Sequence, residues 1–440
     1  MRTFFVCTIA LLSGCLLYNP CHAQEPDTLL AEKFMDLNNT GRFSEAKEMF
    51  AASIRPQLPP DVLKKTWELL NKKYGKYRGI ESMEVIRVDT FRHVRTICDF
   101  EKAEITFSFA FNPSHWLYGF VIVGVSEKDS KPAVSGLLPH TISIDTSVRV
   151  NGGKIYGTLL APKNKKTYPV VLIIAGSGPT DRNGNSTLGE TSNMYLMLAD
   201  SLAAHGIASF RYDKRYLGKS VDFLPSAIEH ISFDDYVDDA ADIVNFLKND
   251  PAFSQVIIAG HSEGSLIGMI AAQKTKVNAY ISLAGAGENF GKILEWQLDQ
   301  QEGINKDTVK NILNTIREGK IATDIPSYLQ MLFLPYLQHY MFTEMRYDPS
   351  EEIKKLSVPV LIVNGTTDIQ VNMKQAELLH RAKPDAALSI IPGMNHILKD
   401  APEERSENIA TYNNPDLPLN GTLIKEIVQF INSIPSHSHS

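Results

Sequence analysis

The feature that most constrains the fold is a serine between two glycines, in the pentapeptide Gly-His-Ser-Glu-Gly at residues 260–264. The apolar run Val256 to Ala259 precedes it and predicts a buried strand, whereas Leu266 to Lys274 predicts a helix. In this setting Ser262 lies on a sharp, strained turn, and side chains at the glycine positions would collide with the neighbouring strand or helix. The pentapeptide alone also suits an ordinary turn, but its strand-to-helix context favours a nucleophile elbow.

Strands and helices alternate on both sides of this pentapeptide. Continuous apolar strands that alternate with helices predict a mostly parallel sheet with helices on both faces. A hairpin turned at residues 151–153 precedes them, with strands at 141–149 and 154–160. The predicted strands cover residues 170–175, 207–212, 256–260, 279–284, 360–364 and 387–391, and the helices 193–205, 234–248, 266–274, 373–381 and 423–431.

A helical insertion interrupts this alternation at about residues 285–350, with helices predicted at 293–301, 306–318 and 328–345. An insertion of this length in an α/β pattern is typical of a cap over the site or of a separate packing element. Its aromatic and methionine side chains would suit a wall that faces the substrate, or they pack the helices together: Trp296, Tyr328, Met331, Phe333, Tyr336, Tyr340, Met341 and Phe342.

The length of 440 residues allows about two to three domains. Residues 26–125 have helical periodicity first and strand-like runs afterwards, at 83–88, 91–99, 104–111 and 117–125, which predicts a small α+β domain. The polar connector at 126–139 separates it from a second domain at residues 140–435.

The N-terminus has the pattern of a signal peptide at residues 1–23. Arg2 supplies the charge, Phe4 to Leu17 the apolar stretch and Cys21-His22-Ala23 the cleavage site, so we expect an exported protein, periplasmic or secreted. In the alternative, residues 12–15 resemble a bacterial lipobox and Cys15 carries a lipid anchor. The apolar run continues past Cys15, which favours simple secretion. No later stretch reaches the ~18 consecutive apolar residues of a membrane span.

Composition excludes several classes of function. The formal net charge of -6, with no cluster of basic residues interleaved with aromatic ones, disfavours nucleic acid as a partner. After cleavage at Ala23 only Cys98 is left, so no disulfide can form within one molecule. The chain has no H-E-x-x-H motif and no cysteine-histidine cluster, so we expect no metal and no cofactor.

A serine hydroxyl needs a base to take its proton and a third group to orient that base. His396 follows the strand at 387–391 through a short turn, and Asp368 follows the strand at 360–364, which places both at the carboxyl edge of the sheet with Ser262. Asp385 precedes a strand and therefore lies at the opposite edge. The predicted catalytic residues are Ser262, Asp368 and His396, although Asp368 would also suit a turn that caps the next helix.

An oxyanion hole needs two backbone N–H groups aimed at the developing charge. We expect one from Glu263, which follows the nucleophile. The other lies in the glycine-rich loop at residues 176–179, where Ser177 is the first candidate and Gly178 the second. The side chains of His261 and Glu263 are expected to be scaffolding of the elbow.

With these motifs, residues 141–434 resemble serine hydrolases of the α/β-hydrolase superfamily. They are similar to bacterial carboxylesterases that carry a Gly-Ser-Gly-Pro loop followed by an Asp-Arg-Asn-Gly sequence, here residues 181–184. Residues 210–220 match a loop of the same group, with Tyr216 where glycine is more usual, and Ala175 stands where many relatives have histidine. Residues 34–50 resemble a small α+β domain found ahead of some bacterial hydrolases.

The resemblance implies an α/β-hydrolase fold with a helical cap insertion, preceded by the small α+β domain. It also implies a carboxylesterase-type serine hydrolase that cleaves small-molecule esters with a short or medium acyl group through an acyl-enzyme on Ser262. The alternatives are a serine peptidase or aminopeptidase of the same fold, and a non-catalytic protein that binds a ligand. The sequence leaves the oligomeric state open.

Overall fold

The structure is a computed structural model that describes residues 26–435, except 53, 59–60, 89–90, 129–140, 164, 187–189, 222, 224–229, 302, 327 and 330–331. The predicted signal peptide, the lipobox with Cys15, most of the polar connector and Met331 therefore lie outside the described residues. Within the described part, no helix combines the length and the apolar character needed to cross a membrane.

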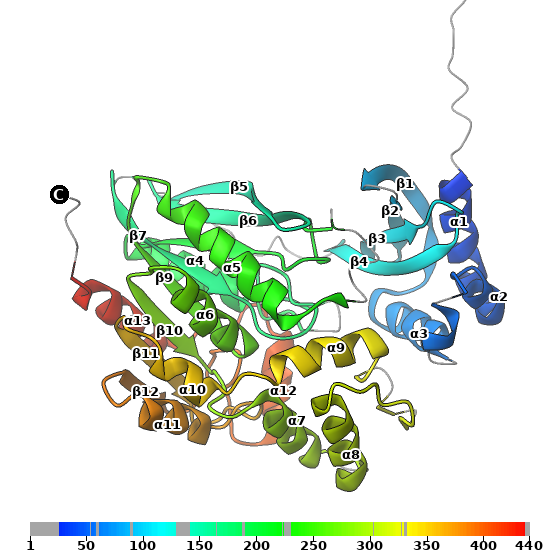
Figure 1. Cartoon of the computed structure of the whole chain (residues 1–440). Coiled ribbons are helices and arrows are strands. Elements are labelled where there is room, and N and C mark those ends of the chain that lie inside the picture. Colours follow the sequence, from blue (N-terminus) through cyan, green and yellow to red (C-terminus); the bar gives the residue numbers. More distant parts are fainter. Residues whose placement is uncertain are drawn as a thin grey trace, which may run out of the picture.

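The N-terminal part consists of a four-stranded antiparallel sheet, in the order β1-β2-β3-β4, with helices packed on it (Figure 1). Phe34 of the first helix contacts the rings of Phe50 and Phe109 edge to face, at 5.7 Å between centroids in each case. Aromatic side chains from helices and strands therefore form one shared core. The elements are α1 (Pro26–Asn39), α2 (Phe43–Glu48), η1 (Arg55–Gln57), α3 (Val62–Tyr74), β1 (Tyr77–Val88), β2 (Phe91–Phe100), β3 (Ala103–Phe111) and β4 (Leu117–Glu127).

The rest of the chain builds an eight-stranded sheet in the order β12-β11-β10-β9-β7-β8-β6-β5. The strands from β8 to β12 pair in parallel with one another and with β7, whereas β5 and β6 add an antiparallel edge. This mostly parallel sheet confirms the predicted fold class. The strands are β5 (Thr141–Val150), β6 (Gly153–Pro162), β7 (Tyr168–Ile174), β8 (Ala208–Tyr212), β9 (Phe253–His261), β10 (Ala279–Leu283), β11 (Val360–Gly365) and β12 (Ala387–Ile391).

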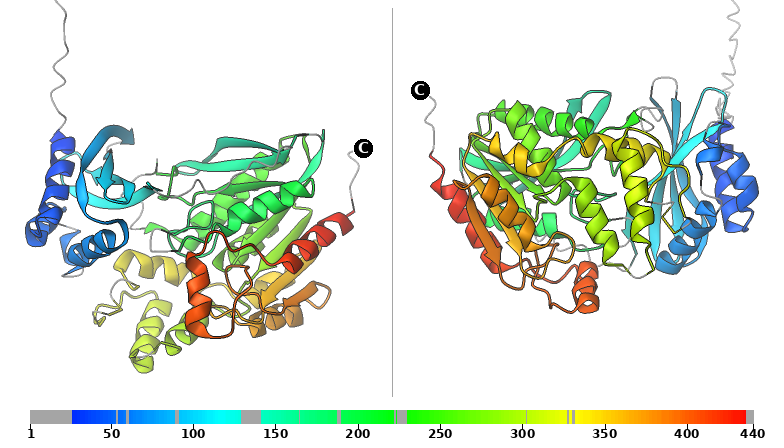
Figure 2. Two further views of the ribbon diagram at one scale, coloured as in Figure 1. Left: turned by 180° about the vertical axis from the view of Figure 1, so that it is seen from behind. Right: turned by 60° about the horizontal axis from the view of Figure 1, so that its bottom comes forward.

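Helices cover both faces of this sheet, as the uninterrupted apolar strands predict (Figures 1 and 2). On β7, Val170 and Leu172 belong to one core, and Val171 and Ile173 belong to the core on the opposite face. The pleat thus divides each strand between two cores. The first core includes α5 (Phe233–Lys248), α6 (Glu263–Lys274), α10 (Pro349–Lys354) and α11 (Met373–Ala382), and the second includes α4 (Met194–Ala204) and α13 (Gly421–Ser433).

The insertion forms a helical cap with an apolar core of its own. The helix predicted at residues 328–345 is wrong in its first half, because the helix begins only at Pro335. Proline has no N–H for a helical hydrogen bond and clashes with the preceding turn, so it is tolerated only at the start of a helix. The cap helices are α7 (Phe290–Asp299), α8 (Lys306–Arg317) and α9 (Pro335–Glu344).

A short helix after the last strand was not predicted. It comprises α12 (Arg405–Ala410) and continues into η3 (Thr411–Asn413), between β12 and α13. Figure 2 shows α12 in orange-red below the sheet, and both α12 and the cap helix α7 contribute to the cavity described below. Six residues are too few to establish a hydrophobic periodicity in the sequence.

Candidate active site

The elbow forms where β9 ends at His261 and α6 begins at Glu263. Ser262 between them has φ 54° and ψ −122°, in the left-handed half of backbone space that side chains other than glycine avoid. A Cβ atom at Gly260 would lie 2.1 Å from the carbonyl oxygen of Gly264, and one at Gly264 would lie 2.4 Å from that of Ile174. Only glycine fits at either position, so helix and strands can approach closely behind the serine.

Asp368 and His396 meet at the carboxyl edge of the sheet. His396 Nδ1 donates to Asp368 Oδ2 at 2.9 Å, and both side chains are buried. The other oxygen, Asp368 Oδ1, accepts the backbone N–H groups of Gln370 and Val371 at 2.8 Å each. Backbone groups of the two residues that follow closely in the sequence thus hold the carboxylate of Asp368, and the carboxylate in turn holds the ring of His396. Asp385 is exposed and pairs with Lys383.

Ser262 and His396 line the same cavity, of about 530 Å³. This volume is in the range of sites for small molecules. The aromatic residues considered for a substrate-facing wall do not line it within the described part of the chain; Phe333 and Met341 pack in the core of the cap instead. Further lining residues come from the glycine-rich loop, the cap and the α12 region, among them Ser177, Glu190, Gln297, Gln301, Gln370, Arg405, Ile409, Tyr412 and Asn413.

The glycine-rich loop at residues 176–179 lies against the elbow. A Cβ atom at Gly176 would lie 3.0 Å from the Cβ of Ser262, which is closer than most real Cβ contacts. The absence of a side chain at Gly176 therefore lets the loop backbone approach the serine. Gly176 is buried, whereas Ser177 is exposed and lines the cavity. Glu263 follows Ser262 directly, and Ser177 follows Gly176 and lines the same cavity as the serine.

His261 joins this loop to His396 through a chain of hydrogen bonds. Its Nε2 lies 2.8 Å from the backbone oxygen of His396, and because a carbonyl only accepts, Nε2 carries the proton. Nδ1 then accepts from the Tyr195 hydroxyl at 2.9 Å, and the hydroxyl oxygen accepts the N–H of Gly176 at 2.9 Å. Burial, together with the neighbouring His396, lowers the pKa of His261 to about 3, so the ring is neutral.

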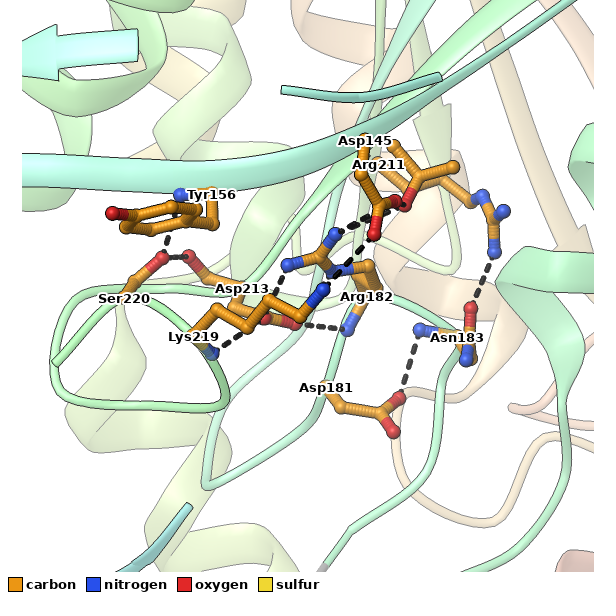
Figure 3. A network of polar contacts seen from close by, with 10 residues as sticks. Asp145, Tyr156, Asp181, Arg182, Asn183, Arg211, Asp213, Lys219 and Ser220 are labelled. Carbon is orange, nitrogen blue, oxygen red and sulfur yellow. Dashed lines mark hydrogen bonds and ion pairs between the residues drawn. The ribbon is translucent and has the colours of Figure 1, made fainter. Parts of the chain in front are cut away.

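The two motifs of the family resemblance meet Asp145 of β5 in one polar clasp (Figure 3), made of Asp145, Arg182, Asp213 and Lys219. Arg182 binds Asp213 through two side-chain nitrogens, at 2.6 and 3.0 Å. The same carboxylate accepts the backbone N–H groups of Arg182 and Lys219, at 3.1 and 2.9 Å. The clasp thereby ties the loop after β7 to the loop after β8.

Tyr216 adopts the conformation of the glycine that is more usual at its position. Its φ is 67°, and its N–H donates to the carbonyl oxygen of Ser220 at 2.7 Å. The ring packs on Phe223 at 5.4 Å between centroids. The turn is therefore retained despite the substitution, and the aromatic contact contributes to holding the strained residue in place.

The strand order and the strand–elbow–helix arrangement define a protein of the α/β-hydrolase class. The described residues contain no group of three or more His, Cys, Asp or Glu side chains placed to hold a metal ion.

Comparison with known proteins supports an α/β-hydrolase of the serine hydrolase type. Residues 186–296, which include the elbow, match the family model described as serine aminopeptidase, S33. Residues 31–120 match a family described as a protein of unknown function, DUF3887. Esterase EstD of Thermotoga maritima is 23% identical over 367 residues, which cover 81% of this chain and 84% of that protein.

Solved structures with a similar fold include the following two. Est1E from Butyrivibrio proteoclasticus is 18% identical, with a TM-score of 0.43 over 66% of this chain and 99% of its own. Proline iminopeptidase of Mycobacterium smegmatis is 15% identical, with a TM-score of 0.44 over 66% of this chain and 98% of its own.

Proposed function

We propose that the protein is a carboxylesterase that cleaves small-molecule esters with a short or medium acyl group. The observation that carries this proposal is His396, which is held by Asp368 and lines one cavity with Ser262 on its elbow. The similarity to Esterase EstD over most of the chain supports an ester as the substrate.

In the proposed reaction, Ser262 Oγ attacks the ester carbonyl while His396 Nε2 takes its proton. Asp368 holds the ring in the correct tautomer and stabilises the imidazolium. The N–H groups of Ser177 and Glu263 would donate to the oxyanion of the tetrahedral intermediate. His396 then protonates the departing alcohol, an acyl-enzyme is left, and water activated by the same histidine releases the acid and restores Ser262.

The second candidate is an aminopeptidase, which the matched family model favours by its description. A carboxylate in the cavity would suit the ammonium group of a peptide N-terminus, and Glu190 lies there. Burial raises the pKa of Glu190, however, which disfavours the charged form that an ammonium would require. A small ester needs no such charge, and we therefore place the esterase first.

A fluorophosphonate probe tests whether the protein is a serine hydrolase at all. We expect it to label the wild-type protein on Ser262, and labelling should disappear in Ser262→Ala. Folded wild-type protein that is not labelled would contradict the proposal and favour a non-catalytic protein that binds a ligand. A panel of nitrophenyl esters, compared with aminoacyl nitroanilides at matched concentration, separates the two enzymes, since faster amide turnover would favour the aminopeptidase.

We also propose that the protein is exported, on the evidence of the signal-peptide pattern at residues 1–23. The mass of the mature N-terminus tests this. A chain that begins at Gln24 is expected, whereas a lipid-modified Cys15 would establish the membrane-anchored alternative, and an intact Met1 would exclude both.

A further inference from the structure

Gly176, in the loop beside Ser262, is held by two side chains that come from different elements. Its N–H donates to the hydroxyl of Tyr195 on α4 at 2.9 Å, and its carbonyl oxygen accepts from Lys214 Nζ at 2.6 Å. Lys214 is buried and lies in the loop after β8. Both contacts are made by side chains and neither is a backbone hydrogen bond of a strand or helix, so both serve to fix this one residue of the loop.

The neighbours of Lys214 keep its backbone in place. Asp213 is bound by Arg182 in the clasp, and Arg215 binds Asp239 through two nitrogens at 2.6 and 2.8 Å. The residues on both sides of Lys214 are thus anchored by buried ion pairs. The backbone position from which the lysine side chain reaches Gly176 is therefore fixed.

The contact with the carbonyl oxygen of Gly176 also determines the direction of the next N–H group. The C=O of Gly176 and the N–H of Ser177 belong to one planar trans peptide and point in opposite directions. With the oxygen held by Lys214, the N–H of Ser177 must point away from the lysine. Ser177 lines the cavity next to Ser262, where an oxyanion would form.

The surroundings act on the charge of Lys214 in two directions. Burial lowers the pKa of Lys214, and the carboxyl groups of Glu263 and Glu344 act against this. The face of the Tyr236 ring lies 5.7 Å from Nζ, which also suits a cation. Nζ of Lys214 thus lies near one aromatic face and two carboxyl groups.

Of these two carboxyls, Glu263 is the one whose contacts favour the charged form. Burial raises the pKa of Glu344 well above its usual range, and its Oε2 is buried with no hydrogen-bond partner among the described residues. Burial also raises the pKa of Glu263, but Lys214 and the hydrogen bond that Oε1 accepts from the Tyr340 hydroxyl at 3.1 Å both act against this. Glu263 is also partly accessible, which suits a counter-charge for Lys214.

We propose that Lys214 is a positioning residue of the oxyanion hole, whose ammonium orients and polarises the Gly176–Ser177 peptide so that the N–H of Ser177 donates to the oxyanion. The inference rests on the proposed function, because it assigns a task within the same reaction. A hydrogen bond from a charged donor is stronger than a neutral one, and hydrogen bonds in series strengthen one another. The N–H of Ser177 thereby becomes a better donor when negative charge develops.

Lys214→Met tests the inference, because methionine keeps the length of the side chain without its charge. We expect kcat for a nitrophenyl ester to fall about ten- to hundredfold, less than the loss of a whole oxyanion donor, while KM changes little. The affinity for a boronic acid, which forms a tetrahedral adduct with the serine, should fall in parallel with kcat/KM. Lys248→Met is the matched control, since this lysine is exposed at the end of α5 and lies outside the clasp, and it should behave as wild type.

A merely structural role for Lys214 would lower the thermal stability and leave kcat and boronic-acid affinity of the folded variant unchanged, which would overturn the inference. A rise in KM at constant kcat would also overturn it. If Lys214→Met does not fold, Lys214→Met with Glu263→Gln removes both charges together, and the same loss of kcat is expected. Wild-type activity in that folded double variant would contradict the inference.

Labelling by the fluorophosphonate separates this inference from the proposed function. A lack of labelling in the folded wild-type protein would contradict both the proposed function and the role of Lys214. Labelling of the wild type at the same rate as Lys214→Met would contradict the role of Lys214 alone.

Discussion

Protonation of His261 should cost the folded protein stability in mild acid. The ring is neutral in the fold, because Nε2 donates to His396 and Nδ1 accepts from Tyr195. Burial lowers its pKa to about 3, whereas an unfolded chain has the ordinary value of about 6.5. The unfolded state therefore binds more protons between these two values. Stability from this group is fully present above about pH 6.5 and is lost progressively as the pH falls toward 3.

The size of the effect follows from the difference in pKa. A pH of 5 lies about 1.5 units below the pKa of the histidine in the unfolded chain, so that histidine is mostly protonated there. The ring in the folded protein is still neutral at this pH. At 1.36 kcal/mol per unit, the free energy of unfolding falls by about 2 kcal/mol between pH 7 and pH 5. For a domain of this size the melting temperature would decrease by roughly 5 °C from this residue alone.

Calorimetry of the wild type and of His261→Gln from pH 7 to pH 5 measures this contribution. Glutamine does not titrate, so the stability of the variant should decrease less steeply with acid, and the two curves should converge. A constant offset at neutral pH reflects lost packing and does not enter the comparison. His205→Gln, at an exposed position after α4, is the control for the loss of one histidine. Parallel curves for the wild type and His261→Gln would refute the reasoning.

Three further substitutions have defined outcomes. Asp368→Asn should lower kcat by about 10⁴ because His396 would be held in the wrong tautomer; a loss below tenfold in steady-state assays would speak against the triad. Gly264→Ala should destabilise by about 3 kcal/mol, since its Cβ would lie 2.4 Å from a backbone oxygen, and wild-type stability in urea would exclude this clash. Arg182→Met leaves Asp213 buried without its partner, and should cost about 3–5 kcal/mol in the same measurement; a change near zero would show that the clasp contributes little.

The fold could be predicted because its strands are short, apolar and buried on both faces. Every strand predicted between residues 170 and 391 is present, with ends that differ by a few residues. Asp368 and His396 could be selected because each follows a strand, and the carboxyl ends of parallel strands meet at one edge. The structure brings these two side chains together at 2.9 Å. Their catalytic roles, and those of Ser177 and Glu263, remain predictions.

The supporting residues could not be found in this way. Tyr195 lies on a helix whose other inward residues are ordinary apolar ones, and nothing local distinguishes its hydroxyl. Lys214 was visible only as part of a motif, because its contact with Gly176 spans 38 positions of the sequence. Contacts of this kind depend on how separate elements pack, which a periodicity does not record.

The cavity wall could not be predicted for a related reason. The aromatic side chains of the cap suggested a wall of the substrate cavity. The apolar face of an amphipathic helix packs against a core, however, and in the cap this is the core between its own helices. The described cap residues that line the cavity are Gln297 and Gln301, and further lining comes from α12, which was not predicted. Substrate preference therefore depends on the parts of the chain with the weakest local signals.

The buried charges around the elbow have a cost that packing must offset. Ion pairs removed from water seldom stabilise a fold more than apolar residues of the same shape, and burial raises the pKa of Asp239 to about 6 even beside Arg215. Apolar residues could hold the loops after β7 and β8 together, but they could not direct a peptide group. Gly176 is bound at both its N–H and its carbonyl oxygen, which determines the orientation of the backbone next to Ser262. The polar network therefore selects one geometry of the loop, and that selection is what an oxyanion hole requires.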